Sequence, residues 1–368
     1  MKKTAIALAA ALAASLTLGT AALAGGEKGE VHVYNWSDYI GEGVLEKFEK
    51  ATGYKVIYDT FDSNEILETK LLTGHTGYDV VVPSATFLAR QIQAGVFQKL
   101  DKSKLPNLKY VWPEIAQRVA AYDPGNQYSV NYMWGTTGIG YNIDKVREVL
   151  GDDAPVDSWA LVFDPKYMKK LAECGVHFLD APTEMIPAAL NYIGEDPDSH
   201  DPAVIRKAEP VLMAVRPYVR KFHSSEYINA LANGDICVAI GWSGDVLQAR
   251  DRADEADNGV HIAYSIPKEG AVMWFDQMAI PADAPNPEGA HAFINFMLDP
   301  KIAAENTNYV WYANGVEESK KYIDPEILDD TAVYPDEATL KKLYVTTPYD
   351  LKTQRLVTRI WTRIKTGH

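Results

Sequence analysis

The stretch VHVYNWSDYI, residues 31–40, decides the fold that the sequence predicts. Its first residues are β-branched or aromatic, which predicts a strand. The strand breaks into aromatic, hydroxyl and carboxylate residues, and glycines and an apolar helical pattern follow. Open α/β sheets place ligand-binding groups at such strand ends. Taken alone, the stretch also fits an ordinary turn in which Trp36 and Tyr39 are core aromatics.

The same pattern recurs along the chain. Strands are predicted at 54–58 and 78–82, and helices at 44–52, 62–74 and 84–94 separate or follow them. Strands that alternate with helices over short links predict a parallel sheet covered on both faces. A second alternating region starts at 176, and its strands end in polar or aromatic residues at 180–184 and 241–245.

The first residues predict a segment that is removed. Two lysines at the start precede an Ala/Leu-rich run that ends in Ala22-Leu23-Ala24. A charged beginning, an apolar run and a small-residue cleavage site are typical of a secretory signal peptide, so residues 1–24 are predicted to be cleaved. The remaining residues, about 344, are too many for one ordinary domain and indicate two.

Composition and charge disfavour several classes of function. The formal net charge is −14, and losing the two leader lysines makes it −16. An acidic surface disfavours nucleic acids and anionic membranes and favours cationic ligands. Two cysteines, Cys174 and Cys237, predict one disulfide in an exported chain, although two buried free thiols also fit. The disulfide would close a loop of about 64 residues, which corresponds to roughly 4 kcal/mol.

The candidate site residues share a position just after a predicted strand or at an aromatic cluster. They are aromatic, hydroxylic or acidic, and none is Lys, Arg or His. They are Trp36, Ser37, Asp38, Tyr39, Ser84, Glu184, Trp242, Asp245, Trp274, Asp276 and Tyr312.

This one-sided chemistry indicates the class of ligand. A site for phosphate or carboxylate would carry Arg, Lys or helix N-termini. Acids that converge without a cation repel one another, and their pKa values rise. A bound cation removes that conflict, while aromatic rings attract it through their quadrupoles. Apolar walls with acids at intervals therefore fit an elongated cation that carries several ammonium groups.

Enzymatic functions fit less well. The stretch 241–245 resembles a nucleophile elbow but carries Asp245 where the last glycine is needed. A secreted carbohydrate-active hydrolase that uses Asp245 and Asp276 as paired carboxylates remains the alternative. The eight histidines are scattered without metal-ligand spacing, and Gly138-x-Gly140 lacks the third glycine of a dinucleotide site. Neither a metal nor a cofactor is expected.

Five motifs resemble one family, the periplasmic polyamine-binding receptors of ABC importers, which bind putrescine or spermidine. The resemblance covers the whole mature chain. The motifs are YNWSDYI (34–40), FDSNE (61–65), YDVVVPS (78–84), FHSS (222–225) and AIGWSGD (239–245).

The resemblance implies an α/β fold with two lobes, the type II periplasmic binding fold, in which the lobes close over the ligand by a hinge. Each lobe is expected to contain a mixed, mainly parallel sheet flanked by helices, and two crossover segments are expected to join them. The expected division is 27–134 with 258–303 in lobe 1, and 135–257 with 304–368 in lobe 2.

The resemblance also implies a role for each site residue. Trp36, Trp242 and Trp274 would enclose the methylenes, and Tyr39 and Tyr312 would complete the wall. In the same way, Asp245 and Asp276 would hold one ammonium group, Asp38 and Ser37 the other, while Ser84 and Glu184 would act directly or through water. The family's cysteine pair matches Cys174 and Cys237.

Ligand preference and partners follow from the same resemblance. Putrescine-type members often have Phe where this chain has Trp274, which favours spermidine and leaves putrescine open. The chain is expected to be a periplasmic monomer without enzymatic activity or membrane insertion. Its expected partners are a polyamine and an inner-membrane ABC permease, with no nucleic acid.

Overall fold

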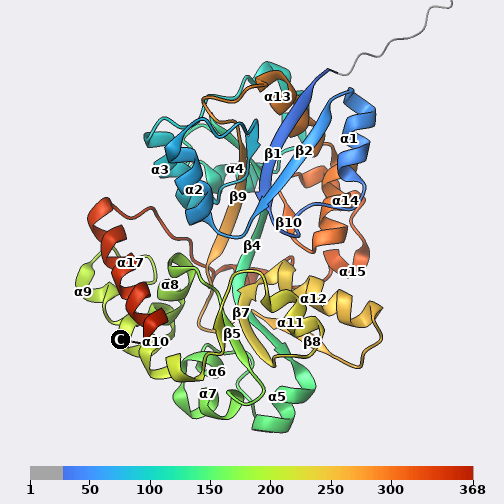
Figure 1. The fold of residues 1–368 in the computed structure, drawn as a ribbon. Coiled ribbons are helices and arrows are strands. Elements are labelled where there is room, and N and C mark those ends of the chain that lie inside the picture. Colours follow the sequence, from blue (N-terminus) through green and yellow to red (C-terminus); the bar gives the residue numbers. More distant parts are fainter. Residues whose placement is uncertain (1–27, 368) are drawn as a thin grey trace, which may run out of the picture.

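The computed structural model describes residues 28–367. The predicted leader at 1–24 lies outside this part of the chain. Helices and strands gather into two groups that long strands connect (Figure 1). Each group has its own buried apolar core. The predicted α/β fold with two lobes is therefore confirmed.

The first lobe is built around β1, whose residues Val31 and Val33 are fully buried. Parallel ladders join β1 to β2 and to β3, and β3 pairs antiparallel with β9. Its strands and helices are β1 (Glu30–Trp36), β2 (Lys55–Phe61), β3 (Val80–Val81), β9 (Met273–Ala279), β10 (Ala313–Asn314), α1 (Val44–Thr52), α2 (Asn64–Thr73), α3 (Ala85–Gln93), α4 (Pro113–Val119), α13 (Pro287–Met297), α14 (Pro300–Val310) and α15 (Pro325–Leu328).

The second lobe contains the parallel strands β5, β6 and β7, with β5 in the middle. Trp159, Tyr227 and Phe178 are among the large side chains that fill its core. Its strands and helices are β5 (Val176–Phe178), β6 (Lys221–Phe222), β7 (Val238–Trp242), β8 (Ile262–Ser265), α5 (Ile143–Leu150), α6 (Ala160–Phe163), α7 (Pro165–Leu171), α8 (Pro182–Tyr192), α9 (Pro202–Ile205), α10 (Ala208–Val215), α11 (Tyr227–Ala232), α12 (Ser243–Glu255) and α17 (Leu351–Thr366).

Strand β4 (Ser129–Asn142) runs through both lobes. Its first half pairs antiparallel with β9, and its second half pairs with β7 and β8. Crossover segments between the lobes were expected, and this one is a continuous strand. A Cβ at Gly135 would lie 2.8 Å from the ring of Trp274. Glycine is therefore needed for that ring to pack across the strand.

The crossing that leads to the C-terminal helix follows residue 334, whereas the predicted division placed it after residue 303. Here an extended segment separates α16 (Glu337–Leu340) from α17. In this segment Tyr344 accepts a hydrogen bond from the Met273 N–H at 2.7 Å and donates its own N–H to Ala271 at 3.0 Å. The β-branched run 345–347 and Pro348 explain why the helix is interrupted.

The lobe boundaries differ from those predicted. Val310, Tyr312 and Val316 belong to the core of the first lobe, whereas Ile262 and Ala271 belong to that of the second. Sequence periodicity found these elements but gave no information about which core they join. We propose 28–134 with 273–334 as lobe 1, and 135–272 with 351–367 as lobe 2.

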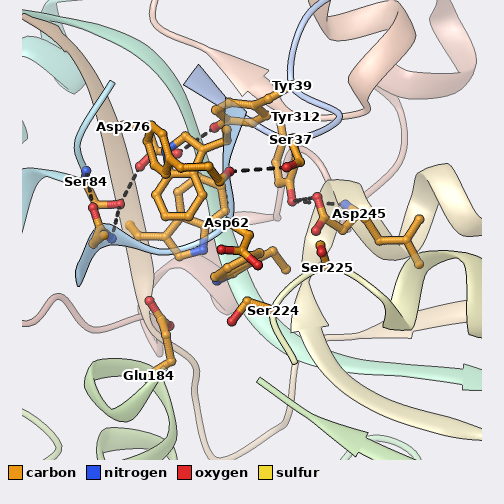
Figure 2. Close-up of a pocket in the computed structure, with 16 residues that line it drawn as sticks. Ser37, Tyr39, Asp62, Ser84, Glu184, Ser224, Ser225, Asp245, Asp276 and Tyr312 are labelled. Atoms are coloured by element: carbon orange, nitrogen blue, oxygen red, sulfur yellow. Dashed lines mark hydrogen bonds between the residues drawn. The ribbon is translucent and has the colours of Figure 1, made fainter. Parts of the chain in front are cut away.

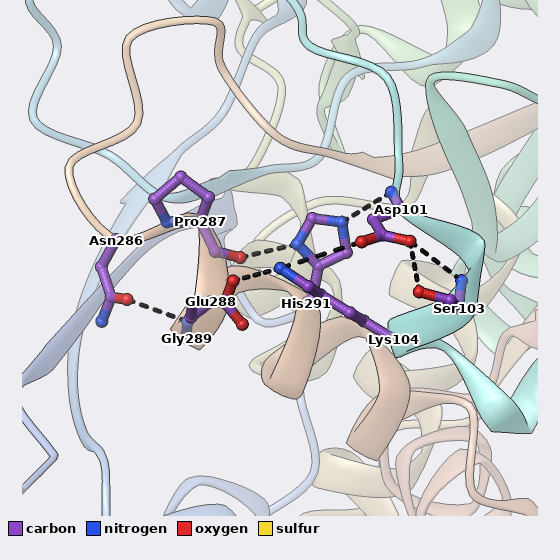
Figure 3. A network of polar contacts seen from close by, with 8 residues as sticks. All are labelled: Asp101, Ser103, Lys104, Asn286, Pro287, Glu288, Gly289 and His291. Atoms are coloured by element: carbon purple, nitrogen blue, oxygen red, sulfur yellow. Dashed lines mark hydrogen bonds and ion pairs between the residues drawn. The ribbon is translucent and has the colours of Figure 1, made fainter.

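A polar network fixes the segment after residue 100 against α13 (Figure 3). The side chain of Asn286 caps α13 by accepting the Gly289 N–H at 2.9 Å. The ring of His291 accepts the Asp101 N–H through Nε2 at 2.9 Å, and its Nδ1 lies 2.6 Å from the Pro287 carbonyl oxygen. This buried ring therefore joins two segments that are distant in the sequence and stabilises the outer side of lobe 1.

A disulfide between Cys174 and Cys237, 63 residues apart, confirms the predicted pairing. It ties the residues after α7 to the start of β7, a strand that leads to the candidate site. Replacing both cysteines with serine should lower the free energy of unfolding by about 4 kcal/mol, because the unfolded chain gains the freedom of that loop. Urea denaturation of the double variant measures the loss, and an unchanged midpoint would contradict it.

Candidate functional site

A cavity of about 500 Å³ lies where strand ends of both lobes meet. From the first lobe it receives the ends of β1 and β2, the N-terminus of α3 and two residues of β9. From the second lobe it receives the ends of β6 and β7 and the first turns of α8 and α12. Its lining consists of Trp36, Ser37, Tyr39, Phe61, Asp62, Asn64, Ser84, Glu184, Ser224, Ser225, Ile228, Trp242, Asp245, Trp274, Asp276 and Tyr312.

Aromatic rings form the walls. Trp36 donates its indole N–H to the Val82 carbonyl at 2.8 Å, which fixes the ring beside the end of β3. Its centroid lies 5.6 Å from that of Trp242, so an aromatic contact joins the two lobes. Trp274 lies 5.3 Å from Tyr312 in an edge-on arrangement. These rings offer several π faces to a ligand.

Asp276 is held by hydroxyl groups in the first lobe. Its carboxylate accepts hydrogen bonds from Ser84 Oγ at 2.6 Å and from Tyr39 at 2.8 Å (Figure 2). Burial raises the pKa of Asp276 to about 7, against the lowering effect of both hydroxyls, and the charge of Asp245 raises it slightly further. The two hydrogen bonds therefore hold the side chain in place but offset only part of the cost of ionising it.

Asp245 is the equivalent group of the second lobe. It lies in the first turn of α12 and accepts hydrogen bonds from Tyr227 and Tyr312, each at 2.7 Å. Burial raises its pKa to about 6, while the two hydroxyls lower it. A Cβ at Gly244 would lie 2.5 Å from the ring of Tyr312, so glycine lets this tyrosine reach the carboxylate.

Glu184 supplies a third buried carboxylate from the start of α8. Thr137 donates a hydrogen bond to it at 2.6 Å. Its pKa rises to about 7, chiefly through burial. The sequence predicted raised pKa values from mutual repulsion of the acids. The direction is confirmed, but burial is the larger cause and repulsion the smaller.

No basic side chain of the described residues meets these acids inside the cavity, and only the more distant Arg252 slightly lowers the pKa of Asp245. Among the described residues that line the cavity, none is Lys, Arg or His. Asp62 adds a fourth carboxylate, which Figure 2 shows among the labelled polar groups. The donors that hold the three buried carboxylates are hydroxyl groups of Ser, Thr and Tyr. A cation that enters the cavity would therefore meet acceptors and aromatic faces.

Asp38 differs from the prediction. It does not line the cavity but forms an ion pair with Arg252 of α12, with 2.7 Å between Oδ1 and Nη2. Asp38 has φ 53°, a left-handed conformation that aspartate tolerates. This turn directs its side chain away from the cavity, where Ser37 and Tyr39 remain. The pair joins the two lobes outside the cavity instead of holding a ligand end.

The structure brings the other ten predicted residues together in this cavity. The prediction missed Phe61, Asp62, Asn64, Ser224, Ser225 and Ile228. Five of them follow or end β2 and β6, so the strand-end rule that found Trp36 could have found them. Their motifs had been used only for the family resemblance.

The described part of the chain offers neither a metal-binding cluster nor a membrane-spanning helix. Residues 28–367 contain no group of three or more His, Cys, Asp or Glu side chains placed to hold a metal ion. Within the same part of the chain, no helix has both the length and the apolar character that a membrane span requires.

Comparisons with known proteins agree with this fold. The sequence model of the bacterial extracellular solute-binding proteins matches residues 43–334. The putrescine-binding periplasmic protein SpuD of Pseudomonas aeruginosa is 56% identical over 337 residues, 92% of each chain. The putrescine-binding periplasmic protein PotF of Escherichia coli is 51% identical over 354 residues, 96% of this chain and 95% of its own.

A solved structure shows the same architecture. A putative spermidine/putrescine ABC transporter protein from Listeria monocytogenes superposes with a TM-score of 0.82 at 34% identity, covering 92% of this chain and 99% of its own. The fold is that of the type II periplasmic binding proteins. The chain belongs to the bacterial extracellular solute-binding protein family.

The raised pKa values predict that ligand binding depends on pH. Carboxylates must be ionised to hold ammonium groups, and those of Asp276, Glu184 and Asp245 have pKa values of about 7, 7 and 6. Affinity for a dication should therefore approach its maximum at pH 8 and fall at least tenfold by pH 5. The same pKa values also affect the stability of the ligand-free protein. They lie above those of the unfolded chain, so the contribution of the three acids to the free energy of unfolding is largest at low pH and is lost as the pH rises.

Calorimetric titrations between pH 5 and 8 measure this dependence. Buffers of different ionisation enthalpy at pH 7 should show that binding releases protons. A change in affinity of less than twofold over this range, or an uptake of protons, would contradict the placement of these carboxylates at the bound cation.

Proposed function

We propose that this protein is a periplasmic receptor that captures polyamines and delivers them to an ABC transporter. The observation that carries the proposal is the set of three buried carboxylates without a basic partner in an aromatic cavity. A linear polyamine complements that set, since its ammonium groups neutralise the acids and its methylenes cover the rings. A charged hydrogen bond contributes about 1.5–3 kcal/mol and a desolvated cation–π contact about 2 kcal/mol. Two ammonium ends that each make both kinds of contact can therefore supply the roughly 8 kcal/mol of micromolar binding.

The positions of the two aspartates support a different pairing of acids with the ligand's ammonium groups from the one that the sequence implied. Asp245 and Asp276 were expected to hold the same group, but they belong to different lobes and are fixed by different hydroxyls. Figure 2 shows them on opposite sides of the cavity. We therefore propose that each holds one end of a diamine, with Ser37 beside the Asp245 end and Ser84 beside the Asp276 end.

Glu184 extends the site for a longer ligand. Together with Ser84 and Trp274 it also lines a small neighbouring cavity that reaches Thr86 and Thr346. We propose that a third amine, as in spermidine, enters this space. The two relatives described above are called putrescine-binding, which supports a diamine as one ligand. Preference between putrescine and spermidine remains a prediction from Trp274, which favours spermidine.

Transport rather than catalysis is the proposed role. The two relatives are named as periplasmic binding proteins, and the similar Listeria protein as part of an ABC transporter. Each buried acid here is engaged by hydroxyl donors, an arrangement that fits the holding of a cation. We propose that the protein works in the periplasm, passes its ligand to an inner-membrane permease and carries out no chemical step. The monomeric state remains a prediction.

Calorimetry with putrescine, cadaverine, spermidine and spermine tests the proposal. Asp276→Asn and Asp245→Asn should each weaken binding at least tenfold, because each removes the charge that meets one ammonium end. Asp152→Asn is the matched control, since that carboxylate is 89% exposed on the surface. It should leave affinity within twofold.

Two results would overturn the proposal. One is the absence of heat with all four polyamines at pH 7.5. The other is an unchanged affinity in both cavity variants, which would remove these acids from the site. Release of sugar from a glycoside would instead establish the carbohydrate-active alternative.

A further inference from the structure

The C-terminal helix α17 is strongly basic in an acidic protein. Its sequence, LKTQRLVTRIWTRIKT, contains five Lys or Arg residues and no acid, whereas the whole chain has a net charge of −14. The buried face, with Leu356, Ile360 and Trp361, packs into the core of lobe 2. The helix is therefore a fixed support for the side chains on its outer face.

Two of the five cations are neutralised within the protein. Arg363 forms a two-pronged contact with Glu209 of α10, at 2.6 and 2.8 Å. Lys365 pairs with Asp180, just after β5, at 2.5 Å. These contacts explain why the last turn of α17 is basic, because they attach the helix to its own lobe.

The other three cations have no such explanation. Lys352, Arg355 and Arg359 are exposed, and within residues 28–367 none of them forms an ion pair or a side-chain hydrogen bond. Spacings of three and four residues place them on one face of the helix, one turn apart. Like charges at this spacing destabilise a helix slightly. The row therefore does not serve the stability of the fold.

The row begins beside the cleft between the lobes. Arg90 of α3, in the first lobe, donates a hydrogen bond to Gln354 at 3.4 Å, between Lys352 and Arg355. Figure 1 shows α17 on the side of lobe 2 where α2 and α3 of lobe 1 lie across from it. Leu351, at the start of the helix, is 78% exposed and adds an apolar side chain to the row.

We propose that Leu351, Lys352, Arg355 and Arg359 form a docking surface for an acidic patch on the periplasmic side of the permease. This inference rests on the proposed function. Three unpaired cations on a rigid helix steer and orient an acidic protein surface, and arginine is common in protein interfaces. The location at the cleft edge favours the permease over the membrane, because the ligand leaves the receptor through this cleft. The acidic remainder of the chain would also be repelled by anionic lipids.

Charge reversal tests the docking surface. Arg355→Glu with Arg359→Glu changes the charge by −4 on α17. The matched control is Lys169→Glu with Lys170→Glu, the same change at exposed positions of α7 in the same lobe, where neither lysine forms an ion pair within the described residues. Receptor-stimulated ATP hydrolysis is measured with the host's permease complex in proteoliposomes, at several receptor concentrations and saturating putrescine.

The α17 variant should raise the half-maximal receptor concentration at least tenfold, and the α7 variant less than twofold. High salt should reduce the difference, since the interaction is electrostatic. Equal effects of both variants would show a general charge effect and overturn the proposal, as would no effect of either. The α17 variant could instead lose binding to protein-free vesicles of phosphatidylethanolamine and phosphatidylglycerol (3:1) while it stimulates the permease as the parent protein does. That result would assign the surface to the membrane and overturn the proposal.

Ligand titration of the same variants separates this inference from the proposed function. Both double variants should bind putrescine with the affinity of the parent protein, because none of the four side chains lines the cavity. If neither they nor the parent bind a polyamine, the proposed function fails. If all bind normally and the α17 variant still stimulates the permease normally, only the docking surface fails.

Discussion

Burial of carboxylates without a basic partner is the constraint on which the site depends. Burial raises the pKa of Asp276 from 3.8 to about 7. Ionising this side chain in the folded protein therefore costs about 4 kcal/mol more than ionising it in water. Hydroxyl donors offset only part of this cost, and Glu184 and Asp245 add to it. A polyamine supplies the missing positive charge. Closure of the two lobes and capture of the cation are therefore coupled, since the closed cavity is favourable chiefly when a cation occupies it.

The acids that create this constraint lie in different lobes. Asp276 belongs to the first lobe through β9, and Asp245 to the second through α12, so one ligand must contact both. The strand β4 connects the lobes and pairs with β9 and β7, which place Trp274 and Trp242 at the cavity. The pair between Asp38 and Arg252 adds a contact between lobes at the surface. Ligand recognition is thus built from positions that a hinge can separate.

Most of the fold and the site could be predicted from sequence because strand ends are visible as local patterns. Trp36, Ser84 and Asp245 each follow an apolar strand, and the structure brings them together. Asp38 could not be placed, because its left-handed backbone and its pairing with Arg252, 214 residues away, leave no local trace. The lobe that receives residues 304–334 was equally hidden, since periodicity shows that a helix is amphipathic but not which core it covers.

The most direct test of this account compares ligands of equal length and different charge. Putrescine, 1-aminobutane and 1,4-butanediol share a four-carbon chain and carry two, one and no ammonium groups. Calorimetry at pH 7.5 should show that 1-aminobutane binds at least a hundredfold more weakly than putrescine, and that 1,4-butanediol does not bind. If the diol bound as tightly as the diamine, the buried carboxylates would not be the basis of recognition, and the central claim would be wrong.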